Sequence, residues 1–213
     1  MPTDRDDLIA GLAADLQPVT PMKRSSGLLL VALATLATVG VVVTWEGLAP
    51  TLASGQVSSN TALANGLLLM LGTAAAVATV AMALPRVGTR YDGPKWATAT
   101  ASIFPAAGMA LLMQGSMQAA LIDAEHGWRC AVNGSLAAVF VAVALLFWLR
   151  RGAPVALHRA GLWLGVAAGA LGSVAYGLTC PLDGVSHLGI WHFLPAAICA
   201  GVGSLVVPRL VRW

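Results

Sequence analysis

Six long runs of apolar residues, separated by short polar segments, dominate this chain of 213 residues. A helix needs roughly 20 mostly apolar residues to cross a hydrocarbon core of about 30 Å. Because lipid offers the backbone no hydrogen-bond partners, runs of this length predict helices. We therefore predict an all-α integral membrane protein, a bundle of six transmembrane helices at about residues 27–44, 63–84, 97–121, 132–149, 160–178 and 190–207.

Charged residues are scarce and unevenly distributed. They make up 10% of the chain, whereas a soluble domain carries about 25%, so the sequence excludes an ordinary soluble globular protein. With six spans the connecting segments alternate between the two sides of the membrane. All 12 Lys and Arg residues except Arg129 then fall on the side of the N-terminus. The positive-inside rule places that side, and both termini, in the cytoplasm.

The segment before the first span has a pattern of its own, and we divide the chain into residues 1–26 and a transmembrane domain at 27–213. Residues 3–17 predict a short amphipathic helix, with acidic residues in its first turn and prolines after its end. Apolar side chains recur on one face of this helix. We call Leu8, Ile9, Leu12 and Leu16 the leucine stripe.

A helix this short is marginal in water, so the leucine stripe needs a cover. A membrane surface fits poorly, because surface-bound helices usually carry basic residues and this one carries Asp7 and Asp15. A cytoplasmic partner with an apolar groove and a basic rim fits better. The third alternative is a passive tail that folds back on the bundle.

Two cysteines are predicted on the outer side, Cys130 between spans three and four and Cys180 between spans five and six. The simplest interpretation is a disulfide, since the extracytoplasmic side is oxidising; it would close a loop of about 50 residues. A second interpretation is a redox sensor or a site for Zn²⁺ or another soft divalent metal, formed by both thiols with His126, His187 and His192. In a third, the thiols are unpaired.

Two further patterns bear on packing and on activity. Glycines recur in the fifth span at Gly161, Gly165, Gly169 and Gly172, and such small faces predict close helix packing in lipid. No acid or base interrupts a span, and phosphate loops, nucleophile elbows and zincin motifs are absent. We expect no enzyme. The competing class is a membrane thiol oxidoreductase or a small transporter, although a CxxC pair is missing.

These features together resemble the NrsF-like family of six-span membrane anti-sigma factors. The resemblance covers nearly the whole chain. It rests on Asp7-Leu-Ile-x-x-Leu-Ala-x-Asp-Leu-x-Pro-Val19, on Cys130 with Cys180-Pro-x-Asp-x-x-x-His187, and on Gly189-Ile-Trp-His192 followed by a terminal Pro-Arg-Leu-Val-Arg-Trp213.

The resemblance implies a negative regulator of an extracytoplasmic-function sigma factor. Such a protein would hold the sigma factor at the bacterial inner membrane, without touching nucleic acid, and release it under periplasmic metal or oxidative stress. Carried over to this chain, Cys130 and Cys180 would be the sensing residues, and Asp7 with the leucine stripe would bind the sigma factor. Because only about 26 residues precede the first span, the cytoplasmic segments 86–95 and 150–159 are expected to share that binding.

Overall fold

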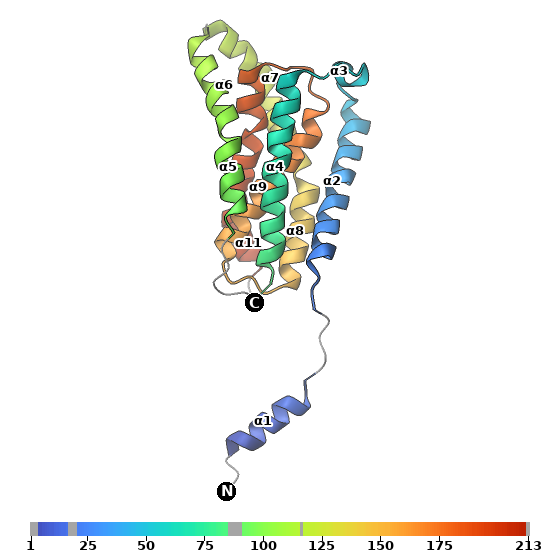
Figure 1. Ribbon diagram of the computed structural model, residues 1–213, viewed down its shortest axis with the longest axis vertical. Helices are drawn as coiled ribbons and strands as arrows, with labels where there is room; N and C mark the ends of the chain where they lie inside the picture. The colour runs from blue at the N-terminus through green and yellow to red at the C-terminus, as the bar shows by residue number, and fades with distance from the viewer. Residues whose placement is uncertain (1–3, 17–20, 85–90, 116, 212–213) are drawn as a thin grey trace.

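The structure is a computed structural model that describes residues 4–16, 21–84, 91–115 and 117–211. Every regular element in these ranges is helical, which confirms the predicted all-α class. Figure 1 shows a bundle of helices aligned with its long axis and one short helix, α1 (Asp4–Ala14), lying apart from it. We call the end of the bundle nearest α1 the inner end and the opposite end the outer end.

Six helical stretches in the described residues are long and apolar enough to cross a membrane, in agreement with the predicted number. Three of them contain interruptions. The stretches are α2 (Arg24–Glu46); α4 (Ser59–Met82); α5 (Gly93–Ala101) with α6 (Ile103–Gln114); α7 (Met117–Ala137) with α8 (Val139–Arg151); α9 (Leu157–Gly177); and α10 (Val185–His187) with the π-helical turn η1 (Leu188–His192) and α11 (Leu194–Leu210). A one-turn helix, α3 (Pro50–Ala53), follows α2.

The end of the third stretch and the start of the fourth differ from the predicted positions. The third stretch ends at Gln114 rather than near residue 121, because Gly115 adopts an extended conformation and its N–H bonds back to Leu111. The polar segment 123–130, expected to be a loop, is helical and belongs to α7. No proline interrupts residues 117–137, and their charged groups can point away from the bundle while the backbone stays hydrogen-bonded.

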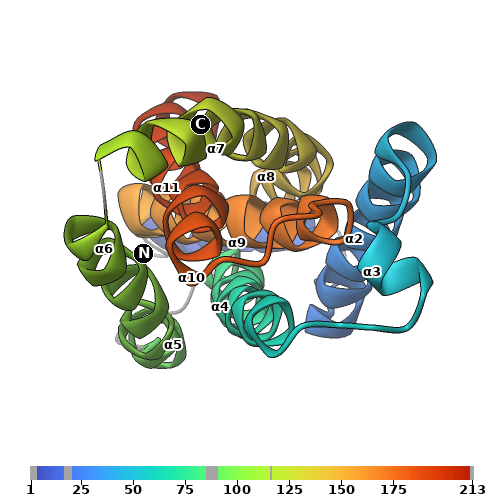
Figure 2. The same cartoon turned by 90° about the horizontal axis from the view of Figure 1, so that it is seen from above.

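Helix α9 occupies the centre of the bundle, with α2, α4, α7, α8 and α11 around it (Figure 2). Its glycines make this possible. A Cβ atom added at Gly161, Gly165 or Gly169 would overlap the backbone of α11, and one at Gly172 would overlap the backbone near Ala138. The predicted close packing on the glycine face of the fifth span is therefore confirmed, and it brings backbones together where lipid supplies no hydrophobic drive.

Two clusters of buried side chains hold the bundle together. Toward the inner end, Trp148 packs among aliphatic side chains of α2, α4, α8 and α9, and its Nε1–H donates to the Val80 carbonyl over 3.1 Å. The second cluster joins α4, α5 and α6 to the last stretch, where the rings of Phe104 and Phe193 stack with centroids 5.8 Å apart. The second cluster also includes Ala170 of α9, so it holds α9 against η1 and the start of α11.

The N-terminal helix forms as predicted but is shorter, and Leu16 follows it rather than belonging to it. The first and last residues of the predicted helix, Thr3 and Gln17, lie outside the described residues. The leucine stripe is exposed, with Leu8, Leu12 and Leu16 at 62%, 63% and 79% exposure. Residues 5–16 are all exposed, so the described structure gives no support to a tail folded onto the bundle.

Candidate functional site

Two thiols and two imidazoles meet inside the outer end of the bundle. We call Cys130, Cys180, His187 and His192 the thiol–imidazole cluster; all four are buried, and their candidate ligand atoms lie within 4.8 Å of one another. The two Sγ atoms are 3.9 Å apart. The His187 Nε2 atom lies 3.4 Å from Cys130 Sγ and 3.7 Å from Cys180 Sγ. The predicted combination of both cysteines with His187 and His192 is thus present.

Three separate segments supply the cluster. Cys130 lies in α7. Cys180 follows the C-terminal end of α9, where Thr179 turns the chain with its N–H and hydroxyl both bonded to the Tyr176 carbonyl. The two histidines come from the start of the last stretch, His187 at the end of α10 and His192 at the end of η1. A disulfide within the cluster would therefore tie α7 to the end of α9, and a metal ion held by all four residues would also include the last stretch.

The π-helical turn brings the two histidines to the same side. Five steps along an α-helix would leave their side chains about 140° apart. A π-helical turn is wider, because its N–H groups bond to the fifth residue along instead of the fourth, so five steps come much closer to a whole number of turns. The rings of His187 and His192 accordingly lie edge to face with centroids 5.7 Å apart. Pro195, which has no N–H to donate, is the second residue of α11, which begins at Leu194 shortly after this turn.

Neighbouring side chains hold the turn in place. The Ser173 hydroxyl of α9 donates to the backbone carbonyl of His192. The ring of Tyr176 lies 6.3 Å from that of His192, and its hydroxyl accepts a hydrogen bond of 3.2 Å from Asn133. Gly127 of α7 leaves room for the Trp191 ring, because a Cβ there would overlap the indole. The cluster is therefore supported from α7 and α9.

One atom of the cluster lacks a partner in the described residues. His192 is 2% exposed, and its Nε2 atom has no hydrogen bond there. A buried polar atom without a partner carries a desolvation cost of about 1–3 kcal/mol. His192 offers one ring nitrogen to the set of ligand atoms that lie within 4.8 Å of one another, and a cation bound there would engage that nitrogen.

The separations among the two sulfurs and the His187 Nε2 atom match those of a tetrahedral metal site, and the ligand atom of His192 completes a set that lies within 4.8 Å. With Zn–S bonds of about 2.3 Å and Zn–N bonds of about 2.0–2.1 Å, neighbouring ligand atoms in a tetrahedron lie about 3.8 Å apart for two sulfurs and about 3.5 Å for sulfur and nitrogen. The corresponding separations are 3.9 Å for the two sulfurs and 3.4 and 3.7 Å from each sulfur to His187. Two thiolates with two imidazoles are also a donor set typical of structural zinc.

The same geometry bears on the chemistry of the thiols. No disulfide joins Cys130 to Cys180, whose sulfur atoms are 3.9 Å apart, so the predicted disulfide is not formed in this structure. The Cys130 thiol lowers the pKa of Cys180 by hydrogen bonding; burial raises it by a smaller amount, and His187 adds to the lowering. Thiolate is the form that binds metals and reacts with oxidants, and the pair is close enough to react as a unit.

The structure separates the remaining predicted residues from the cluster. His126, predicted as a metal ligand, is exposed and does not belong to it. The reason is the helical conformation of the polar segment, in which His126 lies four residues before Cys130, one turn further out. The predicted partner-binding residues, Asp7 and the leucine stripe, lie on and just after α1 beyond the inner end.

Three supporting residues escaped the sequence reasoning. Ser173, Tyr176 and Asn133 contact the cluster or its neighbours, but in sequence they read as small or polar residues within apolar runs. One feature of the last stretch does indicate that its two histidines lie on the same side. Two histidines five residues apart, followed by Pro195, fit a widened helical turn better than a regular one.

Comparisons with known proteins agree on one family. The family model described as NrsF, negative regulator of sigma F, matches residues 12–213. A curated relative from Azospira oryzae (strain ATCC BAA-33 / DSM 13638 / PS), named as a probable anti-sigma-F factor NrsF, is 34% identical over 87 residues, which cover 40% of this chain and 41% of the relative. The matched region thus spans about two fifths of that relative's length. No solved structure matches this chain.

Proposed function

This chain belongs to the NrsF family of negative regulators of sigma F, and from that premise we propose that it is a membrane-bound anti-sigma factor. It holds an extracytoplasmic-function sigma factor at the bacterial inner membrane and releases it when metal or oxidative stress acts on Cys130 and Cys180. The observation that carries the sensing part of the proposal is the thiol–imidazole cluster, with its two buried thiols 3.9 Å apart.

Two chemical events at the cluster serve as the signal. Metal binding replaces the thiol protons with one cation, held by both sulfurs and both imidazoles. Oxidation by a peroxide removes two electrons and two protons from the thiols, joins the sulfurs in a disulfide and reduces the peroxide to two molecules of water. The disulfide draws the end of α9 toward α7, and the metal ion also draws in the last stretch through His187 and His192.

The sigma factor is expected at the inner end of the bundle. The leucine stripe is exposed there, and exposed apolar side chains on a short helix suit binding in a groove of a partner protein. The ends of α8 and α9 place Arg150, Arg151 and Arg159 on the same side. These residues share the binding in the proposal, together with segment 86–95, of which residues 86–90 lie outside the described residues.

Coupling between the two ends needs only a modest free energy. A hundredfold loss of sigma affinity corresponds to about 2.7 kcal/mol, within the usual range of allosteric couplings. The outer end of α7 continues through α8 to the inner end, and α11 continues from η1 in the same direction. A shift of these stretches against α9 moves the surfaces between which the sigma factor is held.

The first experiment tests the partner. The tagged full-length protein is purified from membranes beside a variant with Leu8→Asp, Leu12→Asp and Leu16→Asp. A matched control carries Ala10→Asp and Ala14→Asp on the opposite face of α1. Recovery of a sigma factor with the wild type and the control alone supports the proposal. Recovery with all three moves the contact to the other cytoplasmic segments, and recovery with none contradicts the anti-sigma function and favours the oxidoreductase or transporter.

The second experiment tests the signal. The complex is treated with Zn²⁺, Cd²⁺ or hydrogen peroxide, and sigma release is measured for the wild type and for Cys130→Ser with Cys180→Ser. Release from the wild type alone is expected. Release by metal but not by peroxide identifies metal as the signal, and the converse identifies oxidation. Equal release from the wild type and the double variant contradicts sensing by these cysteines.

A further inference from the structure

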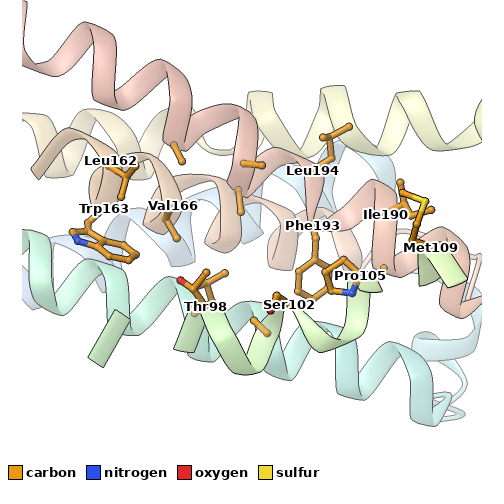
Figure 3. Close-up of a pocket in the computed structure, with 16 residues that line it drawn as sticks. Thr98, Ser102, Pro105, Met109, Leu162, Trp163, Val166, Ile190, Phe193 and Leu194 are labelled. Carbon is orange, nitrogen blue, oxygen red and sulfur yellow. The ribbon is translucent and has the colours of Figure 1, made fainter. Parts of the chain in front are cut away.

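An apolar groove of about 500 Å³ runs along the side of the bundle, between α5 and α6 on one wall and α9, η1 and α11 on the other (Figure 3). The close-up shows its labelled side chains following the helix axes, from Leu162 and Trp163 at one end to Met109 and Ile190 at the other. Small residues such as Ala197 and Ala200 of α11 line part of the groove. A long, narrow, apolar ligand fits this shape.

The groove exists because the third stretch touches the bundle at only some points. The main contacts of α5 are with α4, and those of α6 are with α10 and η1. At the outer end, α6 approaches the last stretch through Gly108 and Gly189, where added Cβ atoms would crowd the opposite backbone. Below this crossing, α5 and α6 face α9 and α11 across the groove. Since these are candidate membrane spans, the groove faces hydrocarbon.

The length of the groove matches one leaflet of a bilayer. Thr98 and Met109 lie toward its two ends on α5 and α6. Eleven helical steps of 1.5 Å give roughly 16 Å. A hydrocarbon core of about 30 Å contains two leaflets of about 15 Å each. One acyl chain running parallel to the bundle therefore extends from one end of the groove to the other.

The inner mouth of the groove carries positive charge on both walls. Lys95 precedes Thr98 by three residues on α5, and Arg159 precedes Leu162 and Trp163 by three and four residues on α9. Residues at these spacings share one face of a helix, so each cation lies one turn below the groove. Lys95 pairs with Asp92 at 2.9 Å, but this pair is exposed and such pairs are weak enough to exchange for another anion.

We propose that one phospholipid from the leaflet on the side of α1 binds in this groove. One acyl chain lies between α5–α6 and α9–α11, and the phosphate lies between Lys95 and Arg159. Two observations select a phospholipid over a wholly apolar molecule. The groove is about as long as one acyl chain, and Lys95 and Arg159 lie one turn beyond its inner end, where the phosphate of a lipid whose chain fills the groove would lie.

This lipid site shares a wall with the thiol–imidazole cluster. Ile190 of η1 and the following Phe193 line the groove, while His192, between them, belongs to the cluster. The bound acyl chain thus supports the turn that holds the histidines. The lipid proposal rests on the groove and on the two cations, and it does not depend on the proposed function.

Native mass spectrometry of the full-length protein in mild detergent tests the proposal. The expected wild-type spectrum contains one phospholipid that persists through detergent exchange. Ala197→Trp fills the groove and should remove that mass, whereas Val202→Trp, on another face of α11 and outside the groove, should retain it. A wild type without bound phospholipid, or one that retains an isoprenoid quinone instead, overturns the proposal, as does full retention by Ala197→Trp.

A second measurement covers the case in which Ala197→Trp does not fold. Phosphatidylglycerol is titrated into delipidated protein, and its affinity is measured for Lys95→Gln with Arg159→Gln and for the control Arg150→Gln. The double variant should bind phosphatidylglycerol at least tenfold more weakly than the wild type does. The Arg150→Gln control should bind it as tightly as the wild type. Equal affinities in all three proteins exclude a phosphate site between Lys95 and Arg159.

Discussion

The two ends of the molecule differ in how far their candidate functional residues are exposed. At the outer end, the side chains of Cys130 and Cys180 are each 7% exposed. At the inner end, every side chain of the leucine stripe is more than half exposed. The outer region is enclosed by α7, α9 and η1. At the inner end, the described part of the chain does not cover the apolar side chains of the leucine stripe. A buried cluster suits the recognition of a small ion or oxidant, and an exposed helix suits the recognition of a protein.

The largest predicted effect comes from the backbone contact that encloses the outer region. Gly165→Ala forces a methyl group into the Cys199 carbonyl of α11, and we expect a loss of about 3 kcal/mol or more. The matched control is Gly66→Ala, where a Cβ meets nothing within 4 Å and the change should be within about 1 kcal/mol, toward greater stability. Thermal unfolding in detergent measures both; equal melting temperatures would contradict backbone contact at Gly165.

The next effect concerns the metal affinity of the cluster. His192→Ala removes the buried imidazole whose Nε2 has no hydrogen bond among the described residues, and the affinity for Zn²⁺ should fall about a hundredfold or more. His126→Ala changes an exposed histidine outside the cluster and should leave the affinity unchanged. Competition with a chromophoric chelator measures both. Equal losses in the two variants would indicate adventitious binding by surface histidines.

A smaller effect is expected from the hydroxyl that supports the π-helical turn. Ser173→Ala removes the hydrogen bond to the His192 carbonyl and should cost about 1 kcal/mol in stability, with a roughly tenfold loss of Zn²⁺ affinity. Ser204→Ala removes a comparable bond, to Gly201 on the exposed side of α11, and should alter neither quantity noticeably. If Ser173→Ala weakens stability but not Zn²⁺ affinity, the hydroxyl supports the fold alone.

The smallest effect on stability comes from the inner helix. Deleting residues 4–16 removes only exposed side chains in the described range 5–16, so unfolding of the bundle should change by less than about 0.5 kcal/mol. Capture of the sigma factor should nevertheless be lost. A marked drop in melting temperature would show that α1 packs against the bundle, and the contrast between the two ends would then be wrong.

The sequence alone predicted much of this arrangement for identifiable reasons. Membrane helices are long and uninterrupted by charge, so their number follows from hydropathy. The position of the cysteines on one side of the bundle followed from the alternation of six spans. The glycine face of α9 was also predicted correctly, because Gly161, Gly165 and Gly169 recur at the spacing of helical turns.

Other features depend on tertiary contacts that periodicity does not reveal. The polar segment 123–130 resembles a loop in composition but is helical, and this moved His126 away from the cluster. The approach of His192 to the thiols depends on a change of helical pitch, which the sequence marks only indirectly through Pro195. The groove beside α5 and α6 depends on where Gly108 and Gly189 let two helices approach.

The π-helical turn Leu188–His192 also acts as a phase shift for everything after it. A π-helical turn has about one residue more than an α-helical turn, and one residue rotates the following helix by about 100°. The face of α11 that packs on the glycines of α9 therefore follows from the same extra residue that directs His192 toward the thiols. Shortening this turn by one residue would rotate both faces away together, so the thiol–imidazole cluster and the packing of α11 on α9 depend on the same helical register.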